Sequence, residues 1–481
     1  EDKLVEEAII KMLAQLDPHS TYSDAEEVKK MNEPLQGNFE GIGVQFQMIE
    51  DTLLVVQPVS NGPSEKIGIL AGDRIIAVND SAIAGVKMST EEIMKRLRGP
   101  KGSKVNLKIV RRGVQDPLVF TVKRDKIPIL SLDASYMIQP KTGYIRINRF
   151  GATTAEEFKK AMKELQKQGM KDMILDLQGN GGGYLNAAID LANEFLGQKE
   201  LIVYTEGRTA KRSDFYAKGN GEFRNGRLIV LVDEYTASAS EIVSGAVQDW
   251  DRGIIVGRRS FGKGLVQRPI DLPDGSMIRL TIARYYTPAG RCIQKPYDSS
   301  TDYNKDLIER FNHGELMNAD SIHFPDSLKV QTKKLGRTVY GGGGIMPDYF
   351  VPIDTTLYTD YHRNLVAKGA VIKFTMKFIE GHRKELANKY KKFESFNEKF
   401  IIDDDMLATL REMGEKEGVK FNEEQYQKSL PLIKTQLKAL IARDLWDMNE
   451  YFRVMNTTNE SVQKALEILN SEEYQKKLRA N

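Results

Sequence analysis

A serine and a lysine, Ser238 and Lys263, have the residue types and spacing best suited to nucleophilic catalysis in this chain. Ser238 begins the run Ser-Ala-Ser-Glu after the apolar stretch LIVLVDEYTA, and Lys263 follows twenty-five residues later in SFGKGLVQ. A serine hydroxyl is a weak nucleophile that needs a positioned base. Lysine can act as that base when burial lowers its pKa from the usual value of about 10.4. The pair therefore predicts a serine hydrolase with a lysine base.

Two other interpretations of these residues stay open. A histidine base is less favoured, because we find none of the five histidines in a motif-like segment, but triad members occur in any chain order and spacing cannot exclude one. Ser238-Ala-Ser-Glu241 also has the form of a capping box at a helix start. Capping and catalysis are compatible, since a helix start directs backbone N–H groups at an anion.

Two glycine-rich segments allow more than one function. The segment DLQGNGGG, residues 176–183, would let main-chain N–H groups approach a substrate carbonyl, as an oxyanion hole requires. A dinucleotide site is disfavoured there because Tyr184 stands where a small residue is needed. The segment GRRSFGKG, residues 257–264, approaches a phosphate loop. However, Gly264 replaces the magnesium-binding Ser or Thr, and a predicted β-hairpin follows instead of a helix.

Eight short strings occur in one order along the chain: STYSD, FEGIGVQF, GDRIIAVND, GYIRINRF, DLQGNGGG, TASASE, GKGLVQ and YTPAGRCIQKP. With them the chain resembles the carboxy-terminal processing peptidases, or tail-specific proteases, which are serine peptidases of family S41 with a PDZ domain. The similarity runs from about LDPHSTY to GGGGIMPDYFVP. The family spacing selects Ser238 over Ser240. Many members have Arg and Pro where this chain has Gln178 and Gly181, so we expect a more mobile turn here.

The resemblance implies roles for individual residues. It makes Ser238 the nucleophile and Lys263 the general base, and Gln267 would orient the lysine. The oxyanion donors would be the amide of Ala239 and the amide of Gly182 in the glycine-rich turn. It also implies a location in the bacterial cell envelope, in the periplasm, with any signal segment absent from this sequence.

A β-rich module is predicted for residues 37–125, where short strand-like runs surround the helix-like run TEEIMKRL. It resembles a PDZ domain, which binds a peptide as an added strand and holds its terminal carboxylate in a backbone loop. The matching loop consists of Gly41, Ile42, Gly43 and Val44. Its apolar residues favour a substrate with an apolar C-terminus. Arg98, at the end of the helix, is our candidate for coupling an occupied PDZ module to the proteolytic core.

Alternating strand-like and helix-like runs predict a layered α/β core of βαβ type over residues 126–353, with a surface insertion at about 297–335. The resemblance implies a crotonase/ClpP-like fold for this core. Residues 1–36 form a predicted N-terminal helical segment, and residues 354–481 a C-terminal helical appendage. These terminal helices could support a homodimer or bind an adaptor.

Length and composition agree with this layout and exclude several classes. A chain of 481 residues suggests about three domains. Its 70 Lys and Arg nearly balance its 67 Asp and Glu, which disfavours nucleic-acid binding. The single cysteine, Cys292, excludes an intrachain disulfide. No apolar run is long enough for a membrane span, and no metal-ligand pattern occurs, so no metal and no cofactor are expected.

The sequence therefore predicts a serine endopeptidase with a Ser-Lys dyad. It would recognise the free, apolar C-terminal tails of proteins or peptides through the PDZ module and cleave near the C-terminus. Three alternatives stay open: a non-catalytic or conformationally locked PDZ scaffold, a phosphate-binding protein that uses residues 257–264, and an acyl-transferring enzyme of a related fold.

Overall fold

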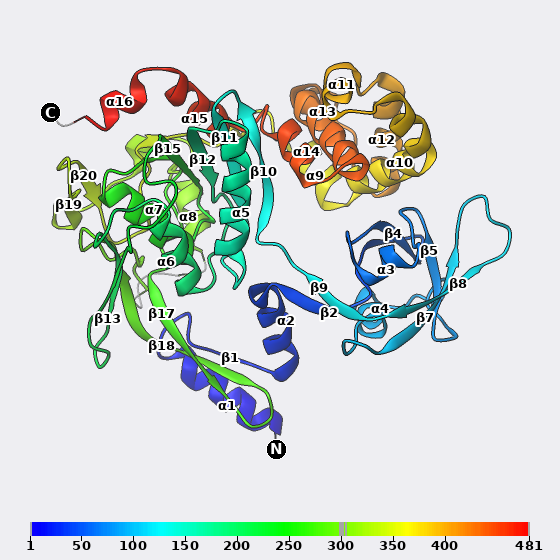
Figure 1. Ribbon diagram of the computed structural model, residues 1–481, viewed down its shortest axis with the longest axis horizontal. Coiled ribbons are helices and arrows are strands. Elements are labelled where there is room, and N and C mark those ends of the chain that lie inside the picture. The colour runs from blue at the N-terminus through cyan, green and yellow to red at the C-terminus, as the bar shows by residue number, and fades with distance from the viewer. Residues whose placement is uncertain (1, 298–302, 304, 480–481) are drawn as a thin grey trace. The chain divides into compact units, whose positions relative to one another are not determined.

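The computed structural model describes residues 2–297, 303 and 305–479. By internal contacts the chain divides into two units, whose elements Figure 1 labels. Unit 1 comprises residues 1–37, 130–354 and 456–481, and unit 2 comprises residues 38–129 and 355–455. The four-part division drawn from the sequence stays a prediction. Of the predicted surface insertion, residues 298–302 and 304 lie outside the described residues.

A six-stranded sheet forms the centre of unit 1, in the order β10-β11-β12-β15-β16-β21. Its strands are β10 (Leu132–Gln139), β11 (Thr142–Ile147), β12 (Asp172–Asp176), β15 (Leu228–Val232), β16 (Ile254–Gly257) and β21 (Tyr349–Phe350). All neighbours from β11 onward are parallel, and only β10 is antiparallel. Strands β12, β15 and β16 are buried along their whole length, as expected for parallel strands covered on both faces. This confirms the predicted α/β core.

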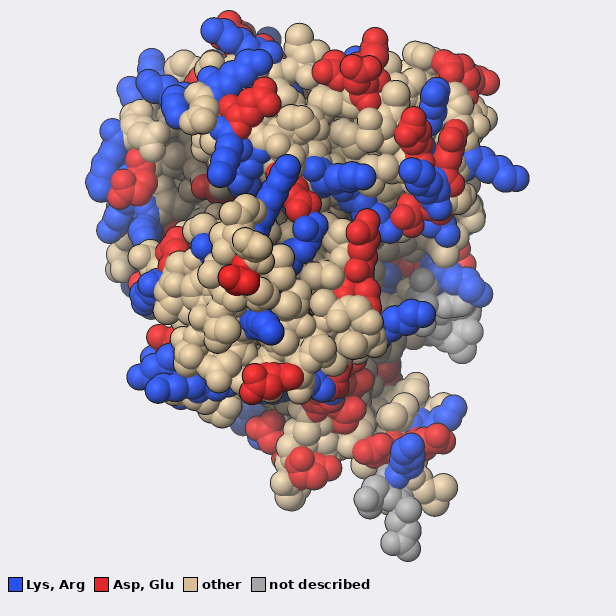
Figure 2. Space-filling model, turned by 90° about the vertical axis from the view of Figure 1, so that its right-hand side faces the viewer, with Lys and Arg blue, Asp and Glu red and all other residues tan. Residues whose placement is uncertain are grey.

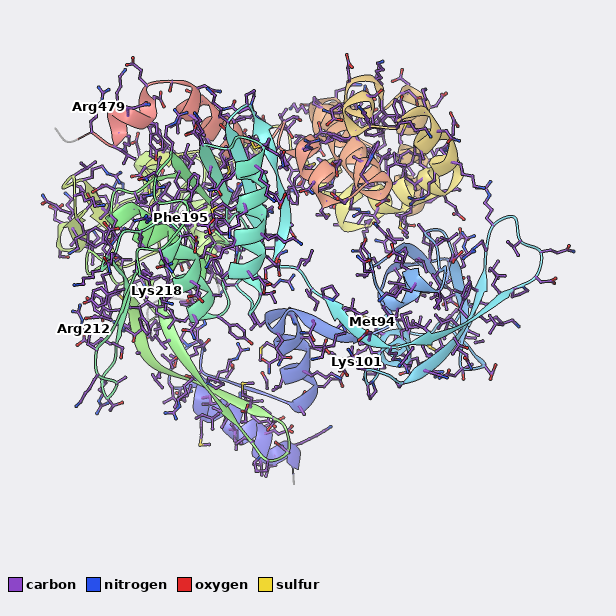
Figure 3. The ribbon with its side chains drawn as sticks, in the orientation of Figure 1. Met94, Lys101, Phe195, Arg212, Lys218 and Arg479 are labelled. Atoms are coloured by element: carbon purple, nitrogen blue, oxygen red, sulfur yellow. The ribbon has the colours of Figure 1, made fainter. Side chains whose placement is uncertain are left out.

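Helices from distant parts of the chain cover this sheet. They are α5 (Thr154–Lys167), α6 (Leu185–Asn193), α7 (Ala239–Asp249) and α15 (Glu460–Asn470). Helix α5 buries Phe158, Met162 and Leu165, whose spacing of four and three residues makes one apolar stripe. Phe195, labelled in Figure 3, meets Phe158 edge to face with ring centroids 5.7 Å apart. Helix α15 contacts β12, β15 and β16, so a segment near the C-terminus completes this layer.

A second sheet in unit 1 is antiparallel and has the order β1-β18-β13-β14, with β17 paired to β18. Its strands are β1 (Thr21–Ser23), β13 (Leu201–Glu206), β14 (Ser213–Tyr216), β17 (Leu265–Asp271) and β18 (Met277–Tyr286). Strands β17 and β18 form the predicted hairpin after Lys263. The run LIVYTEG, which forms β13, fits the predicted βαβ pattern of the core. It pairs with β18 in the second sheet instead, because strand propensity does not specify the partner strand.

The remaining elements of unit 1 lie outside the two large sheets and the helices described above. They are α1 (Asp2–Ala14), α2 (Ala25–Gln36), α8 (Asp306–Asn312), α16 (Glu473–Lys477), β19 (Lys329–Gln331), β20 (Thr338–Tyr340) and the 3₁₀ turns Ala319–Ser321 and Asp326–Leu328. Arg310 of α8 is buried, and its guanidinium donates to the main-chain oxygens of Arg259 and Ser260. This part of the predicted insertion therefore packs onto the segment that precedes Lys263.

The β-rich part of unit 2 has the architecture expected of the PDZ module. Its elements are β2 (Asn38–Gly41), β3 (Val44–Ile49), β4 (Thr52–Pro58), α3 (Pro63–Lys66), β5 (Arg74–Val78), β6 (Ser81–Ala82), α4 (Thr90–Leu97), β7 (Lys104–Val110), β8 (Leu118–Lys123) and β9 (Asp125–Pro128). The main sheet runs β3-β4-β5-β7-β8, and β2 pairs with β9. Helix α4 turns Ile93 and Leu97 into the core, whereas Met94, labelled in Figure 3, is only half-buried.

The helical part of unit 2 has a core of its own, rich in aromatic residues. It contains α9 (Asp360–Ala367), α10 (Ala370–Lys389), α11 (Phe393–Lys399), α12 (Asp404–Lys416), α13 (Glu423–Leu445) and α14 (Met448–Met455). Phe396 is fully buried and stacks on Phe400 with ring centroids 4.6 Å apart. Over the part of the chain that the structure describes, no helix is long and apolar enough to cross a membrane. On the face drawn in Figure 2, basic and acidic side chains are interspersed.

Glu241, in the first turn of α7, joins two segments that lie far apart in the sequence. Its fully buried carboxylate accepts hydrogen bonds from the amides of Ser238 (2.8 Å), Gly262 (2.7 Å) and Lys263 (2.8 Å) and from the Ser260 hydroxyl (2.5 Å). Burial raises the pKa of Glu241, and these four hydrogen bonds oppose the rise. The carboxylate thus fixes the turn that carries Ser238 against the loop that carries Lys263.

We expect Glu241→Gln to destabilise unit 1 strongly. Glutamine would present an NH₂ group to two of the buried donors, and each unsatisfied buried polar group costs about 1–3 kcal/mol, so the free energy of unfolding should fall by about 2–5 kcal/mol. Urea unfolding followed by circular dichroism measures the change. Glu164→Gln, an exposed substitution on α5, is the matched control. Equal stability of the two variants would contradict the anchoring role.

Candidate active site

Ser238 lies at a strained turn between β15 and α7. It is the N-cap residue of α7 and adopts φ 57° and ψ −113°, a conformation that residues with a side chain rarely take. A strand-to-helix turn of this kind exposes a nucleophile, and the helix start behind it favours negative charge. Glu241 satisfies the Ser238 amide, as the predicted capping box requires of its glutamate. The turn therefore has the geometry of a nucleophile position as well as of a cap.

The glycine-rich turn lies directly against Ser238. A Cβ atom on Gly182 would come within 2.8 Å of the Ser238 Cβ and 3.0 Å of the Ala239 nitrogen, so only glycine fits there. Among the described residues the Ala239 amide has no hydrogen-bond acceptor, which leaves it available to an oxyanion. The Gly182 amide instead donates to the Asn180 side chain at 2.9 Å. The structure thus brings both predicted donors together but leaves only Ala239 free.

Side chains and main chain hold this turn from both sides. The Gly179 amide donates to the Asp233 carboxylate at 2.9 Å, and the Asn180 side chain donates to the Ile147 oxygen at 2.9 Å. Arg146 reaches the main-chain oxygen of Gln178 at 2.8 Å. The turn makes these contacts although it lacks the Arg and Pro of many family members. The greater mobility that we expected from their absence stays a prediction.

Lys263 follows the segment bound by Glu241 and has a perturbed side chain. Burial lowers its pKa, the charge of Arg279 lowers it further, and the Glu241 carboxylate acts in the opposite direction. Among the described residues its ammonium nitrogen makes no hydrogen bond or ion pair, and so none joins it to Ser238. A lysine with a lowered pKa and no fixed partner is suited to accept a proton.

Gln267, on β17, binds a residue that sequence reasoning dismissed. Its side-chain NH₂ donates to the main-chain oxygen of His19. The His19 imidazole bonds the Tyr303 hydroxyl at 2.6 Å, and its pKa is lowered to about 4 by burial first and by the charge of Lys263 second. His19 therefore lies near the lysine although we found no histidine in a motif. Its place in LDPHSTY, where the family similarity begins, was the available signal.

Tyr285, on β18, is a second site residue that the sequence analysis missed. Burial raises the pKa of its hydroxyl to about 12, and the nearby Ser238 side chain opposes that rise. Its amide donates to the Gly264 oxygen at 2.7 Å. Only the pairing of β17 with β18 brings this tyrosine to the serine, so the sequence held no motif that could have identified it.

The predicted carboxylate loop lies between β2 and β3 in unit 2. Gly43 has φ +73°, and a Cβ atom there would come within 2.9 Å of Ile127. The Ser64 hydroxyl holds the Ile42 oxygen at 2.6 Å, while the amides of Ile42 and Gly43 have no acceptor among the described residues. Ile42 is 3% exposed and packs in the core of the module, and the peptide-binding role of this loop stays a prediction. Val44 is half-buried beside it.

Arg98 closes α4 as its C-cap residue. Its guanidinium lies over the Phe39 ring, 4.8 Å from the centroid, and its amide donates to the Met94 oxygen. Cation–π packing of this kind holds the side chain against β2. The coupling role suggested for Arg98 stays a prediction.

A surface pocket of about 590 Å³ adjoins the glycine-rich turn. Its lining comes from the start of α6, including Tyr184 and Leu185, and from Ala152 and Ala155 next to and within α5. Within residues 2–297, 303 and 305–479, no cluster of His, Cys, Asp or Glu could hold a metal ion. What the site presents is a serine, a lysine and backbone amides.

Comparison with known proteins identifies the family to which the chain belongs. The profile described as peptidase family S41 matches residues 141–301, the PDZ domain profile matches residues 41–126, and a profile described as a family of unknown function matches residues 361–447. The chain is 40% identical to a carboxy-terminal-processing protease of Bartonella bacilliformis, over 61% of this chain and 68% of that protein. It is 32% identical to a probable CtpA-like serine protease of Staphylococcus aureus, over 85% of this chain and 80% of that protein.

A solved structure titled photosystem II D1 C-terminal processing protease is 32% identical to the chain. The similarity covers 61% of this chain and 80% of that one, with a TM-score of 0.37. From the sequence similarity to the curated relatives and the two family profiles, the chain belongs to peptidase family S41, as a carboxy-terminal processing serine protease with a PDZ domain.

Proposed function

We propose that the chain cleaves proteins near their C-termini with a Ser238–Lys263 dyad after its PDZ domain has bound the C-terminal tail. The observation that carries this proposal is the Glu241 carboxylate, which binds the amides of both Ser238 and Lys263. A strained serine at a helix start and a buried lysine are thereby held by one anchor. No other pair among the site residues combines a nucleophile with a base whose pKa is shifted toward neutrality.

In the proposed reaction, neutral Lys263 takes the proton of the Ser238 hydroxyl, and the Ser238 oxygen attacks the peptide carbonyl. The amide of Ala239 stabilises the oxyanion, helped by the positive end of α7. The Gly182 amide joins it once the Asn180 side chain turns away. Lys263 then gives its proton to the leaving amine, and water, deprotonated by the same lysine, hydrolyses the acyl-enzyme.

Substrate recruitment is assigned to the loop from Gly41 to Val44. Its two amides without acceptors suit a terminal carboxylate, and the peptide would extend β3 as an added strand. The apolar surroundings of Val44 favour an apolar last residue. Half-buried Met94 on α4 has the exposure of a groove residue, whereas Ile93 and Leu97 belong to the core.

A conformationally locked PDZ scaffold is the second candidate, and one feature of the site favours it. The Gly182 amide is bonded to Asn180, and within the described residues no hydrogen bond joins Ser238 to Lys263. In an enzyme at rest this state would give way when substrate binds. In a scaffold it would persist with a peptide bound.

The proposal includes a location in the periplasm. It also includes a second copy of the chain, or an adaptor, that the terminal helices bind. The named relatives are bacterial proteases, and Leu4, Val5 and Met12 of α1 are exposed. Protease accessibility of the chain in intact cells and in spheroplasts tests the location.

We expect Ser238→Ala and Lys263→Ala each to lower kcat/KM by about 10³-fold or more, and the double variant to be no worse, because members of one catalytic unit are not additive. Cleavage of an unfolded protein with an apolar C-terminus is the measurement. Lys218→Ala, at an exposed lysine labelled in Figure 3, is the matched control. Undiminished cleavage by either catalytic variant would exclude the dyad, and no cleavage by the parent chain with peptide binding retained would favour the scaffold.

The pH dependence of kcat/KM should have an acid limb set by Lys263. Activity rises as the lysine loses its proton, and it reaches its plateau below the pH where an ordinary lysine titrates, because burial lowers the pKa. The charge of Arg279 also lowers this pKa, so Arg279→Gln should move the limb to higher pH. Arg212→Gln, at an exposed residue directly before β14, should leave the acid limb at the same pH. A limb that stays or falls in the Arg279 variant would be inconsistent with a lysine base.

Amidation of the substrate C-terminus should raise KM by about tenfold or more, since charge-assisted hydrogen bonds to backbone amides are lost. Two peptides that differ only in a free or amidated C-terminus provide the measurement. A peptide blocked at its N-terminus is the matched control and should be cleaved normally. Equal cleavage of the free and amidated peptides would rule out carboxylate recognition.

Arg98→Ala should leave peptide binding largely intact and lower kcat several-fold, if Arg98 couples the PDZ domain to the core. Fluorescence anisotropy of a labelled peptide gives the affinity, and a cleavage assay gives kcat. Arg96→Ala on the same helix is the control. Normal turnover of the Arg98 variant would remove the coupling role.

A further inference from the structure

The segment from Asp17 to Ser20 forms a turn built around one carboxylate. Asp17 Oδ1 accepts the amides of His19 (2.8 Å) and Ser20 (2.9 Å), and its Oδ2 accepts the Ser20 hydroxyl at 2.5 Å. With three of its own donors satisfied locally, the turn holds the His19 carbonyl in a fixed direction. We call residues 17–20 the Asp17 turn.

Thr281 fixes the Asp17 turn to β18. Its hydroxyl donates to Asp17 Oδ1 at 2.9 Å, and its amide donates to the Ser20 hydroxyl at 3.1 Å. In the register of the hairpin, Thr281 is the direct partner of Gln267 on β17. A register shift between Val266 and Gln267 marks a bulge, a feature that re-aims side chains. The Asp17 turn is therefore bound to Thr281 on β18, which is the cross-strand partner of Gln267, the residue that the turn contacts.

The contact with Gln267 decides the direction of its carboxamide. A glutamine side chain has one donating and one accepting end. The His19 carbonyl can only accept, so it selects the NH₂ group, and the Gln267 oxygen is left as an acceptor for another donor. The Lys263 ammonium is near enough to this turn for its charge to lower the pKa of His19. It has no hydrogen-bond partner among the described residues.

We propose that Asp17 and Thr281 are positioning residues for the lysine base: they hold the His19 carbonyl, which turns the oxygen of Gln267 toward Lys263. The inference rests on the proposed dyad and deepens it. The group that acts on Gln267 is the main-chain carbonyl of His19. Loss of the Asp17 turn would free the carboxamide to rotate and would leave Lys263 less well aligned with Ser238.

Cleavage kinetics give the first test. Asp17→Ala should lower kcat on the order of tenfold with KM little changed, because it misplaces the base and not the substrate. Thr281→Val, which keeps the side-chain shape and removes one hydrogen bond, should have a smaller effect in the same direction. Asp24→Ala removes a capping carboxylate from the same terminal segment and is the matched control.

Coupling separates positioning from a merely structural role. If the Asp17 turn acts through Gln267, then Asp17→Ala should have no further effect on kcat in a Gln267→Ala background. Thermal unfolding of each variant checks that loss of fold does not cause the effect. Additive losses in the double variant would overturn the proposal.

A second readout does not require proteolysis. Competitive labelling of Lys263 with acetic anhydride across a pH series, followed by mass spectrometry, gives its pKa. The acceptor oxygen favours the ammonium form, so Asp17→Ala should lower this pKa, and the Gln267→Ala background should abolish the change. If Ser238→Ala cleaves as well as the parent, the proposed function fails. The labelling would still test whether the Asp17 turn affects the pKa of Lys263. An unchanged Lys263 pKa in Asp17→Ala would refute the inference alone.

Discussion

The buried carboxylate of Glu241 is the interaction on which the arrangement of the site depends. It accepts from the amides on both sides of the site, at Ser238 and at Lys263, and from the hydroxyl of Ser260. A carboxylate without charge partners is costly to bury, and here several donors offset that cost. Because the same group satisfies two segments, the nucleophile turn and the lysine loop cannot shift independently.

Around this anchor, strain and burial give ordinary residues catalytic properties. Ser238 stays at φ 57° because the close approach of Gly182 and the start of α7 leave its turn no relaxed alternative. Lys263 has a lowered pKa because the surrounding core removes water from its ammonium and Arg279 adds like charge. The second effect depends on the antiparallel sheet, because Arg279 lies on β18. The stability of unit 1 and the chemistry of the site are thus linked.

In the proposed mechanism, one oxyanion donor must be released before the site can act. The Gly182 amide is satisfied by the Asn180 side chain, so it is not yet available to an oxyanion. Rotation of the Asn180 side chain would free this amide when the proposed substrate binds. The PDZ domain belongs to a different compact unit from Ser238 and Lys263, so the proposed recognition and cleavage lie on separate parts of the chain.

The sequence alone determined the parts of this protein that depend on local pattern. The strands β12, β15 and β16, helix α4, the hairpin after Lys263 and the serine before α7 follow from periodicity, turn residues and short motifs. Tertiary structure alone decided which distant residues meet. Tyr285 and His19 reach the site, β13 joins the second sheet, and α15 returns to the core. Pairing between strands and packing across the sequence depend on the whole buried surface, which no local window contains.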